Sequence, residues 1–243
     1  MIAFQIKRSA KDLLGNAILI LFPLVLIFFF DYLYKTIDIQ TGMEVAGQQR
    51  LSLLVIGFAL TFQIYGAGLS FETLAEDLYT PMHDRLFASP VEGRTLVLSV
   101  LFSGSVVSFL QSLVIVLFTT VVLGARIPGI PLVLIVLLVS VIFNQLLGTV
   151  LLLLVGTPKV ANVVTTIYGS VVPMLVGLYF PLPTTALFRF IRLYGTPMSL
   201  ANTASIRAME GNFSSMALVM LPILIAIALL LLCLKPLVRR IAV

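Results

Sequence analysis

The sequence predicts an all-α integral membrane protein with six transmembrane helices. Of its 243 residues, 60% are hydrophobic and only 10% are charged, whereas soluble domains carry about 25% charged residues. The apolar residues form six long runs that are nearly free of charge. Each run approaches or exceeds the roughly 20 residues that a hydrocarbon core of about 30 Å requires. The net charge of +5 arises from basic residues that flank these runs, which argues against a nucleic-acid-binding protein.

Residues 1–15 have the pattern of an amphipathic helix that lies on the membrane surface. Lys7, Arg8 and Lys11 share one face of this helix, and the opposite face is apolar. A secretory signal is the alternative, because a basic stretch precedes an apolar run. No small-residue cleavage site follows that run, so we interpret the segment as a retained surface helix.

The charge-poor runs define the six spans within one transmembrane domain, residues 1–243. The third run is long enough to cross the bilayer at a tilt. The predicted spans are residues 16–34, 51–71, 95–123, 131–155, 163–182 and 216–234.

The distribution of Lys and Arg predicts the orientation of the chain. With six spans, both termini and the connection between spans two and three lie on the same side. That side carries nine of the 15 basic residues, and the other side carries six. Both termini and residues 72–94 are therefore predicted to be cytoplasmic.

The insert between spans two and three, residues 72–94, contains eight ionisable residues. Such a segment cannot lie in hydrocarbon, so it stands at a membrane face. Thr80 can cap a helix, Pro81 suits its first position and Pro90 ends it, which predicts a short helix over residues 81–88. This segment either docks as a helix on a cytosolic partner, or it is a solvated loop whose apolar residues pack against the ends of the neighbouring spans.

The segment between spans five and six, residues 183–215, is predicted to face outward with two short helices. The first has an apolar face that includes Leu187 and Tyr194, and it ends near Gly195 and Pro197. The second is expected around residues 200–209 and is predicted to return towards the last span.

Several kinds of chemistry have no support in the sequence. No charged residue lies at mid-depth in any span, which disfavours an ion-coupled carrier. His83 is the only histidine and Cys233 the only cysteine, so neither a catalytic group nor a metal site is predicted. The P-loop pattern Gly-x-x-x-x-Gly-Lys-Ser/Thr does not occur, so we expect no nucleotide bound in this way.

Uncharged polar residues mark two of the spans. They can serve helix packing and interhelical hydrogen bonds, or they can line a polar route that suits an amphiphilic solute better than an ion. The candidates for such a route are Gln63, Gly66 and Ser70 in span two and Thr166, Tyr168 and Ser170 in span five.

Two segments, together with the six-span pattern, resemble the type-2 ABC exporter permeases. Asp84-Arg85-Leu86-Phe87-Ala88-Ser89-Pro90-Val91 is similar to the family's charged-Arg-Leu-x-x-x-Pro segment before span three. Residues 7–16, KRSAKDLLGN, resemble the family's opening. The family often has Glu followed by Gly-Thr before the Arg-Leu segment, whereas this chain has Asp77-Leu78-Tyr79-Thr80.

The resemblance implies a coupling helix that fits a groove on a separate ATPase subunit. It also implies that spans two and five line the route, and that ATP and magnesium bind to the partner while this chain binds no cofactor. The expected assembly has two ATPase copies and a second permease copy or a sister permease, in a bacterial cytoplasmic membrane. The residues implied in ATPase coupling are Thr80, Met82, Asp84, Arg85, Leu86, Phe87 and Pro90.

Two other classes stay open at the level of the sequence. One is the substrate-binding membrane subunit of a vitamin-type importer, which would also lack a P-loop. The long charged insert argues against it. The other is an intramembrane enzyme that acts on lipids, for which Glu72, Glu76 and Asp77 could supply acidic groups.

Overall fold

Every regular element in the computed structural model is an α-helix within the residues that it describes, which are 2–41, 47–80, 93–178, 183 and 185–241. Six of these helices are long and apolar enough to cross a membrane, which confirms the predicted fold class. They are α2 (Leu13–Thr41), α3 (Gly47–Tyr79), α5 (Gly93–Val122), α6 (Ile130–Val155), α7 (Pro158–Val176) and α10 (Phe213–Ile241).

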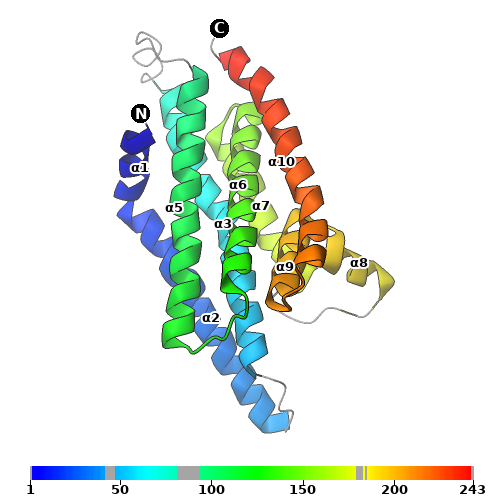
Figure 1. Cartoon of the computed structure of the whole chain (residues 1–243). Helices are drawn as coiled ribbons and strands as arrows, with labels where there is room; N and C mark the ends of the chain where they lie inside the picture. The colour runs from blue at the N-terminus through cyan, green and yellow to red at the C-terminus, as the bar shows by residue number, and fades with distance from the viewer. Residues whose placement is uncertain (1, 42–46, 81–92, 179–182, 184, 242–243) are drawn as a thin grey trace.

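The two termini lie at the same end of the helical bundle, which we call the terminal end (Figure 1). Helix α3 finishes at this end and α5 starts there, on either side of residues 81–92. The connection from α5 to α6 and the short helices α8 and α9 belong to the other half of the molecule, towards what we call the opposite end (Figure 1).

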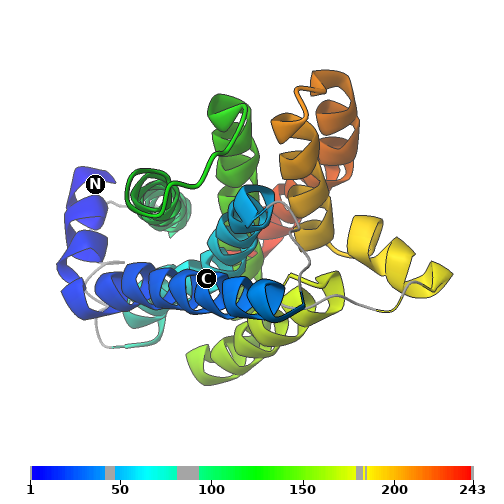
Figure 2. The ribbon, with the colours of Figure 1, turned by 90° about the horizontal axis from the view of Figure 1, so that it is seen from below.

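Helix α3 is the centre of the bundle. It packs against α2, α5, α6, α7 and α9 and also contacts α1, and Figure 2 shows it surrounded by other helices. In its most apolar window 78% of the residues are buried, compared with 17% in α2 and in α10. The outer helices therefore expose apolar side chains, whereas α3 is enclosed by protein.

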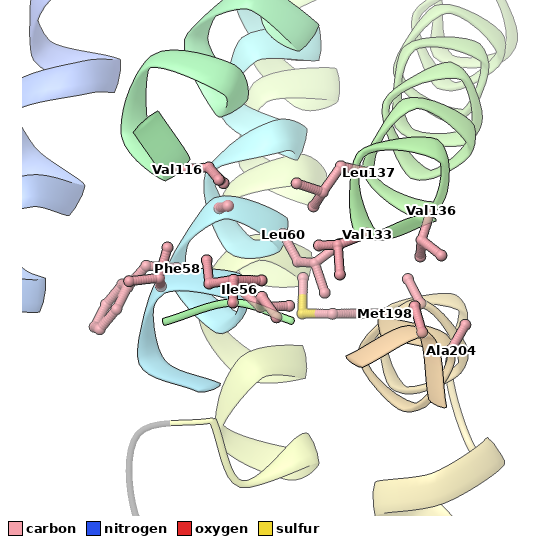
Figure 3. Packing of buried hydrophobic residues seen from close by; sticks show 14 of the residues in the cluster. Ile56, Phe58, Leu60, Val116, Val133, Val136, Leu137, Met198 and Ala204 are labelled. Carbon is pink, nitrogen blue, oxygen red and sulfur yellow. The ribbon is translucent and has the colours of Figure 1, made fainter. Parts of the chain in front are cut away.

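The buried apolar residues form two clusters along the bundle. One cluster, towards the opposite end, joins α3, α5, α6 and α9 through residues such as Ile56, Leu60 and Met198, and Figure 3 shows these side chains gathered between the helices. The other, towards the terminal end, includes Phe71 and Leu74. Both clusters draw on α3, α5 and α6, so these three helices form the continuous core.

The first helix is shorter than the sequence predicts. Residues 1–15 were expected to form one surface helix, but α1 (Ile2–Lys11) ends at Lys11 and α2 begins at Leu13. The Asp12 carboxylate accepts a hydrogen bond of 3.1 Å from the Gly15 amide. A side-chain oxygen in this role satisfies a free amide at the start of a helix, which explains why the break falls at Asp12.

Two other helix boundaries differ from the predicted spans for identifiable reasons. Helix α7 starts at Pro158, where a proline is favoured in the first turn, and it ends before Gly177, which adopts a left-handed φ of 75°. The predicted span was 163–182. Helix α3 continues to Tyr79, past the predicted span end at residue 71, so the first acidic residues of the insert are helical.

The segment between α7 and α10 contains the two predicted helices, α8 (Ala186–Tyr194) and α9 (Pro197–Met209). Helix α8 projects from the side of the bundle, and α9 lies beside α10 (Figure 1). A capping box between Thr196 and Ser199 starts α9, and the Ser199 hydroxyl also donates to the Ile191 carbonyl at 2.8 Å. Because Ser199 joins the two helices, α8 has a fixed position relative to α9.

Close packing at Gly104 gives a testable expectation for stability. A Cβ atom at this position would lie 2.2 Å from the Ser70 hydroxyl oxygen and 2.7 Å from the Gln145 carbonyl oxygen. We expect Gly104→Ala to destabilise the protein by about 1–3 kcal/mol because the neighbouring side chains must shift. Thermal unfolding in detergent measures the change.

Gly68→Ala is the matched control, because its added Cβ would meet only Asn162, at 3.7 Å. Alanine is also the better helix former, so this variant should melt at or above the temperature of the unaltered protein. Equal melting temperatures for the two variants would contradict the packing described here.

Candidate functional site

A belt of polar side chains separates the two apolar clusters at the middle of the bundle. Its members come from the middle of the three core helices, and all of them are buried. We call them the polar belt: Gln63 and Ser70 of α3, Ser108, Gln111 and Ser112 of α5, and Ser140, Asn144 and Gln145 of α6.

Hydrogen bonds across the polar belt join α3, α5 and α6. The Gln63 amide nitrogen lies 3.4 Å from the Ser112 hydroxyl and 3.3 Å from the Leu137 carbonyl oxygen. Asn144 donates to the Gln63 carbonyl oxygen at 3.4 Å, and Gln145 donates to the Ser108 hydroxyl at 2.8 Å. Most of these bonds are long, so the belt is held by several weak contacts rather than by one strong one.

Two carbonyl oxygens in the polar belt lack a hydrogen-bond partner within the described residues. They are Asn144 Oδ1 and Gln145 Oε1. A buried acceptor without a donor has lost its hydration without replacement, which is unfavourable. The belt is therefore a place where a modest shift of one helix, or the entry of water, would improve the hydrogen bonding.

The six residues predicted to line a route fall into two separate groups. Gln63, Gly66 and Ser70 are buried inside the bundle, where Gly66 approaches the Ser108 hydroxyl of α5. On α7, Thr166 and Ser170 are exposed and Tyr168 is half-buried. The hydroxyl groups of Ser170 and Tyr65 lie 3.2 Å apart, so this contact joins α7 to α3 near the surface of the bundle.

Three carboxylates near the end of α3 connect it to two other helices. Arg8 of α1 contacts Asp77 at 2.6 Å and Glu76 at 2.9 Å. One turn earlier, Glu72 accepts a hydrogen bond of 2.5 Å from the Asn162 side chain of α7. The terminal end of α3 is thus bonded to α1 on one side and to α7 on the other.

The electrostatics of the Arg8 ion pairs are dominated by the two carboxylates. Burial acts to lower the pKa of the Arg8 guanidinium, but its hydrogen bonds and charge interactions with Asp77 and Glu76 outweigh this effect. The pKa of Arg8 is therefore raised above its ordinary value, and the side chain is charged at every physiological pH.

This role of Arg8 was not predicted from the sequence, which placed Arg8 with Lys7 and Lys11 on the basic face of a membrane-surface helix. In the structure Lys7 and Lys11 are exposed, whereas Arg8 turns towards α3. One signal could have indicated the pairing: Glu72, Glu76 and Asp77 precede residue 80 with no basic residue among them.

A second set of contacts fixes the junction between α1 and α2. The Asn16 amide nitrogen donates to the Ser9 carbonyl at 2.8 Å and to the Asp12 carbonyl at 2.7 Å. The Asn16 carbonyl oxygen accepts from Gln111 of α5 at 2.7 Å. Asn16 therefore holds together α1, the first turn of α2 and α5.

A family model described as ABC-2 type transporter matches residues 1–209. The chain belongs to the ABC-2 type transporter family. Comparison with curated proteins and comparison with solved structures give no match. Family membership and the six apolar helices identify an integral membrane protein, the permease component of an ABC transporter, and such transporters generally work with an ATPase.

The residues implied in ATPase coupling lie almost entirely outside the described part of this permease. Residues 81–92 include Met82, Asp84, Arg85, Leu86, Phe87 and Pro90, and the predicted helix over 81–88 falls within them. Thr80 is the exception. It follows the last residue of α3, and its hydroxyl donates to the Glu76 carbonyl at 2.5 Å.

Clusters that could bind a metal do not occur in the part of the permease that the structure describes, where no three His, Cys, Asp or Glu side chains come together suitably. The candidate features that the structure describes are the helix-to-helix contacts at the terminal end and the polar belt at mid-bundle.

The Asn16 contacts lead to a testable expectation. Replacing Asn16 with Leu removes three hydrogen bonds and leaves the Gln111 amide without its acceptor. We expect a loss of about 1–3 kcal/mol in unfolding free energy, measured by denaturation of the purified permease in detergent.

Asn202→Leu provides a chemically identical control on α9. The buried Asn202 carbonyl oxygen has no hydrogen-bond partner within the described residues, so its removal should leave stability unchanged or improve it. A larger loss for Asn202→Leu than for Asn16→Leu would show that the Asn16 contacts are not what holds the junction.

Proposed function

We propose that this chain is the permease subunit of an ATP-driven exporter. Two permease copies, or this chain and a sister permease, form the route, and two copies of a separate ATPase supply the energy. The observation that carries the proposal is the family match over residues 1–209 on a bundle of six candidate spans. The sequence contains no P-loop, so ATP and magnesium are assigned to the partner ATPase.

The terminal end of the bundle is assigned to the cytoplasmic side of a bacterial cell membrane. The excess of Lys and Arg on that side of the predicted topology supports this orientation. The basic residues Lys7 and Lys11 of α1 are exposed near this end, where they can approach the negatively charged cytoplasmic leaflet. Export is then movement towards the opposite end.

Residues 80–90 are assigned as the segment that binds the ATPase. Their resemblance to the family's coupling segment supports this role, and so does the position of the flanking helices, since α3 ends and α5 starts at the terminal end (Figure 1). Closure of the two ATPase subunits around ATP would displace this segment, and the displacement would reach the bundle through α3 and α5 as a rigid-body movement.

The exposed polar face of α7 is assigned to the route. Thr166, Ser170 and Tyr65 place hydroxyl groups at or near the surface of a single copy, within the region of the spans. Hydroxyl groups are less favourable in lipid than against a second protein or an aqueous path. Contact with the second permease copy would enclose this face, and its uncharged character suits an amphiphilic substrate. The buried residues Gln63, Gly66 and Ser70 of α3 are assigned to the same route, from the interior of the bundle.

The contacts of the acidic residues do not favour an intramembrane enzyme. Glu72, Glu76 and Asp77 each already bind a side chain of another helix. A general acid or base must reach the substrate proton. These carboxylates instead bind the terminal end of α3 to α1 and α7.

Leu86→Asp tests the assignment of residues 80–90. The substitution would place a carboxylate where an apolar side chain is expected to be buried against the ATPase, at a cost of about 2–7 kcal/mol. We expect the variant to insert in the membrane in normal amounts but to lose copurification with the coexpressed ATPase. Glu92→Gln is the control, because it changes the same connection outside residues 80–90 and adds no charge.

Normal ATPase copurification by Leu86→Asp would reject the assignment of this segment as the ATPase-binding element. ATP hydrolysis by the isolated permease, free of contaminating ATPases, would reject the proposed function as a whole.

Cysteine labelling tests the orientation. In a Cys233→Ser background, Arg192→Cys on the exposed surface of α8 should react in intact cells with a membrane-impermeant maleimide. Lys159→Cys, exposed at the start of α7, should react only after the cells are opened. The reverse pattern would place the terminal end outside. Both positions are exposed, so a lack of reaction reports sidedness rather than burial.

A further inference from the structure

The junction between α3 and α7 carries a row of polar side chains at the surface of the bundle. Towards the terminal end, Glu72 of α3 accepts the hydrogen bond of Asn162, and farther along the two helices Tyr65 meets Ser170. Asn162, Thr166 and Ser170 recur at every fourth residue of α7, so they share one face of that helix. We call these five residues the α3–α7 ladder.

Glu72 supplies the charge of this ladder. Its side chain is exposed, and it binds the neutral amide of Asn162 without an ion pair among the described residues. The other two carboxylates at this end of α3, Glu76 and Asp77, are instead paired with Arg8. Glu72 is also the one Asp, Glu, Lys or Arg in three stretches that adjoin this face, residues 16–30 of α2, 62–72 of α3 and 162–170 of α7. Each copy therefore presents one uncompensated negative charge at the terminal end of an otherwise uncharged face.

Aromatic rings continue the ladder from α3 towards α2. The ring centroids of Tyr65 and Phe62 are 5.6 Å apart, and those of Phe62 and Phe22 are 5.7 Å apart. Phe22 of α2 is 51% exposed, and Figure 2 shows α2 (blue) and α7 (yellow-green) on the same side of α3. Aromatic faces attract organic cations and pack against planar apolar groups. The ladder thus adjoins a surface that suits the apolar part of such a cation.

The chemistry of this surface favours one class of substrate over two others. A phosphate-bearing substrate would be repelled by Glu72, and the adjoining stretches offer it no Lys or Arg. Lys159 lies outside them, exposed at the start of α7. A hard metal cation such as Mg²⁺ takes about six oxygen ligands, whereas the ladder has a single carboxylate. An organic cation with aromatic groups matches both the charge and the rings.

We propose that the α3–α7 ladder makes the permease selective for amphiphilic organic cations and that Glu72 selects the positive charge. This inference rests on the proposed function, which assigns the exposed face of α7 to the route. Glu72 attracts the cationic group at the cytoplasmic entrance of that route. The rings of Tyr65, Phe62 and Phe22 bind the apolar groups farther in.

The test uses the complete complex with the ATPase in lipid nanodiscs and two probe ions of nearly equal size and shape. Tetraphenylphosphonium is a cation and tetraphenylborate an anion, and both carry four phenyl groups. Equilibrium dialysis with each radiolabelled ion measures binding, and binding to empty nanodiscs is subtracted. The unaltered complex should bind the phosphonium more tightly than the borate, and this preference should weaken at high salt because salt screens an exposed charge.

Glu72→Gln removes the charge but keeps an oxygen that can accept from Asn162, so the contact between α3 and α7 is retained. Its affinity for tetraphenylphosphonium should fall about three- to tenfold, as expected for loss of a partly exposed ionic contact. Glu76→Gln is the matched control, because it removes a negative charge one turn later on α3 that faces Arg8 of α1. Its affinity for the phosphonium should change by less than about twofold.

Two substitutions of Tyr65 separate the ring from the hydroxyl group. Both lose the contact with Ser170, but Tyr65→Phe keeps an aromatic face and Tyr65→Leu does not. We expect Tyr65→Phe to bind tetraphenylphosphonium like the unaltered complex and Tyr65→Leu to bind it about fivefold more weakly. Equal affinities for these two variants would show that the ring is not part of the binding surface.

Three results would overturn the inference: no binding of tetraphenylphosphonium by the unaltered complex, equal binding of the two probe ions, or an unchanged phosphonium affinity in Glu72→Gln. Each leaves the proposed function intact. Failure of the unaltered chain to copurify with the ATPase would instead contradict the proposed function, and this failure is detected before any probe ion is added.

Discussion

The enclosure of α3 by protein along most of its length is the constraint on which the rest of this structure depends. Helix α3 carries Gln63 and Ser70 at mid-depth and three carboxylates at its terminal end, and these groups cannot face lipid without a large loss of hydration. Helices α5 and α6 supply the amide and hydroxyl partners at mid-depth, and α1 and α7 supply partners for the carboxylates. The arrangement of the other helices follows from these needs.

Small residues permit this enclosure. Gly66 lies against Ser108, Gly104 against Ser70, and Gly148 against Phe71 and Ala67. Close approach of helix backbones increases van der Waals contact, which holds helices together in lipid where the hydrophobic effect between helices is absent. The polar belt thus combines tight packing with weak, incompletely satisfied hydrogen bonds.

The sequence predicted the features that follow from one-dimensional patterns. Hydropathy identified six spans, and the turn residues Gly195 and Pro197 predicted the end of the first short helix between α7 and α10. The pairing of Arg8 with Asp77 was not predictable in this way, because 69 positions separate the two residues and a surface helix with three basic residues suggested lipid as the partner. The burial of Gln63 within one copy was equally hidden, since helical periodicity shows which residues share a face but not which neighbour that face contacts.

Helix α9 has a consequence for the biogenesis of the protein. Its 13 residues are too few to cross a membrane, and it buries Ser199, Thr203 and Ser205 among its apolar positions. A segment this short and polar does not partition into lipid by itself. Its packing partners include α3, α6 and α8, made earlier, and α10, made later. The burial of α9 is therefore complete only after α10 has entered the membrane, which makes the final docking of α9 a late folding step.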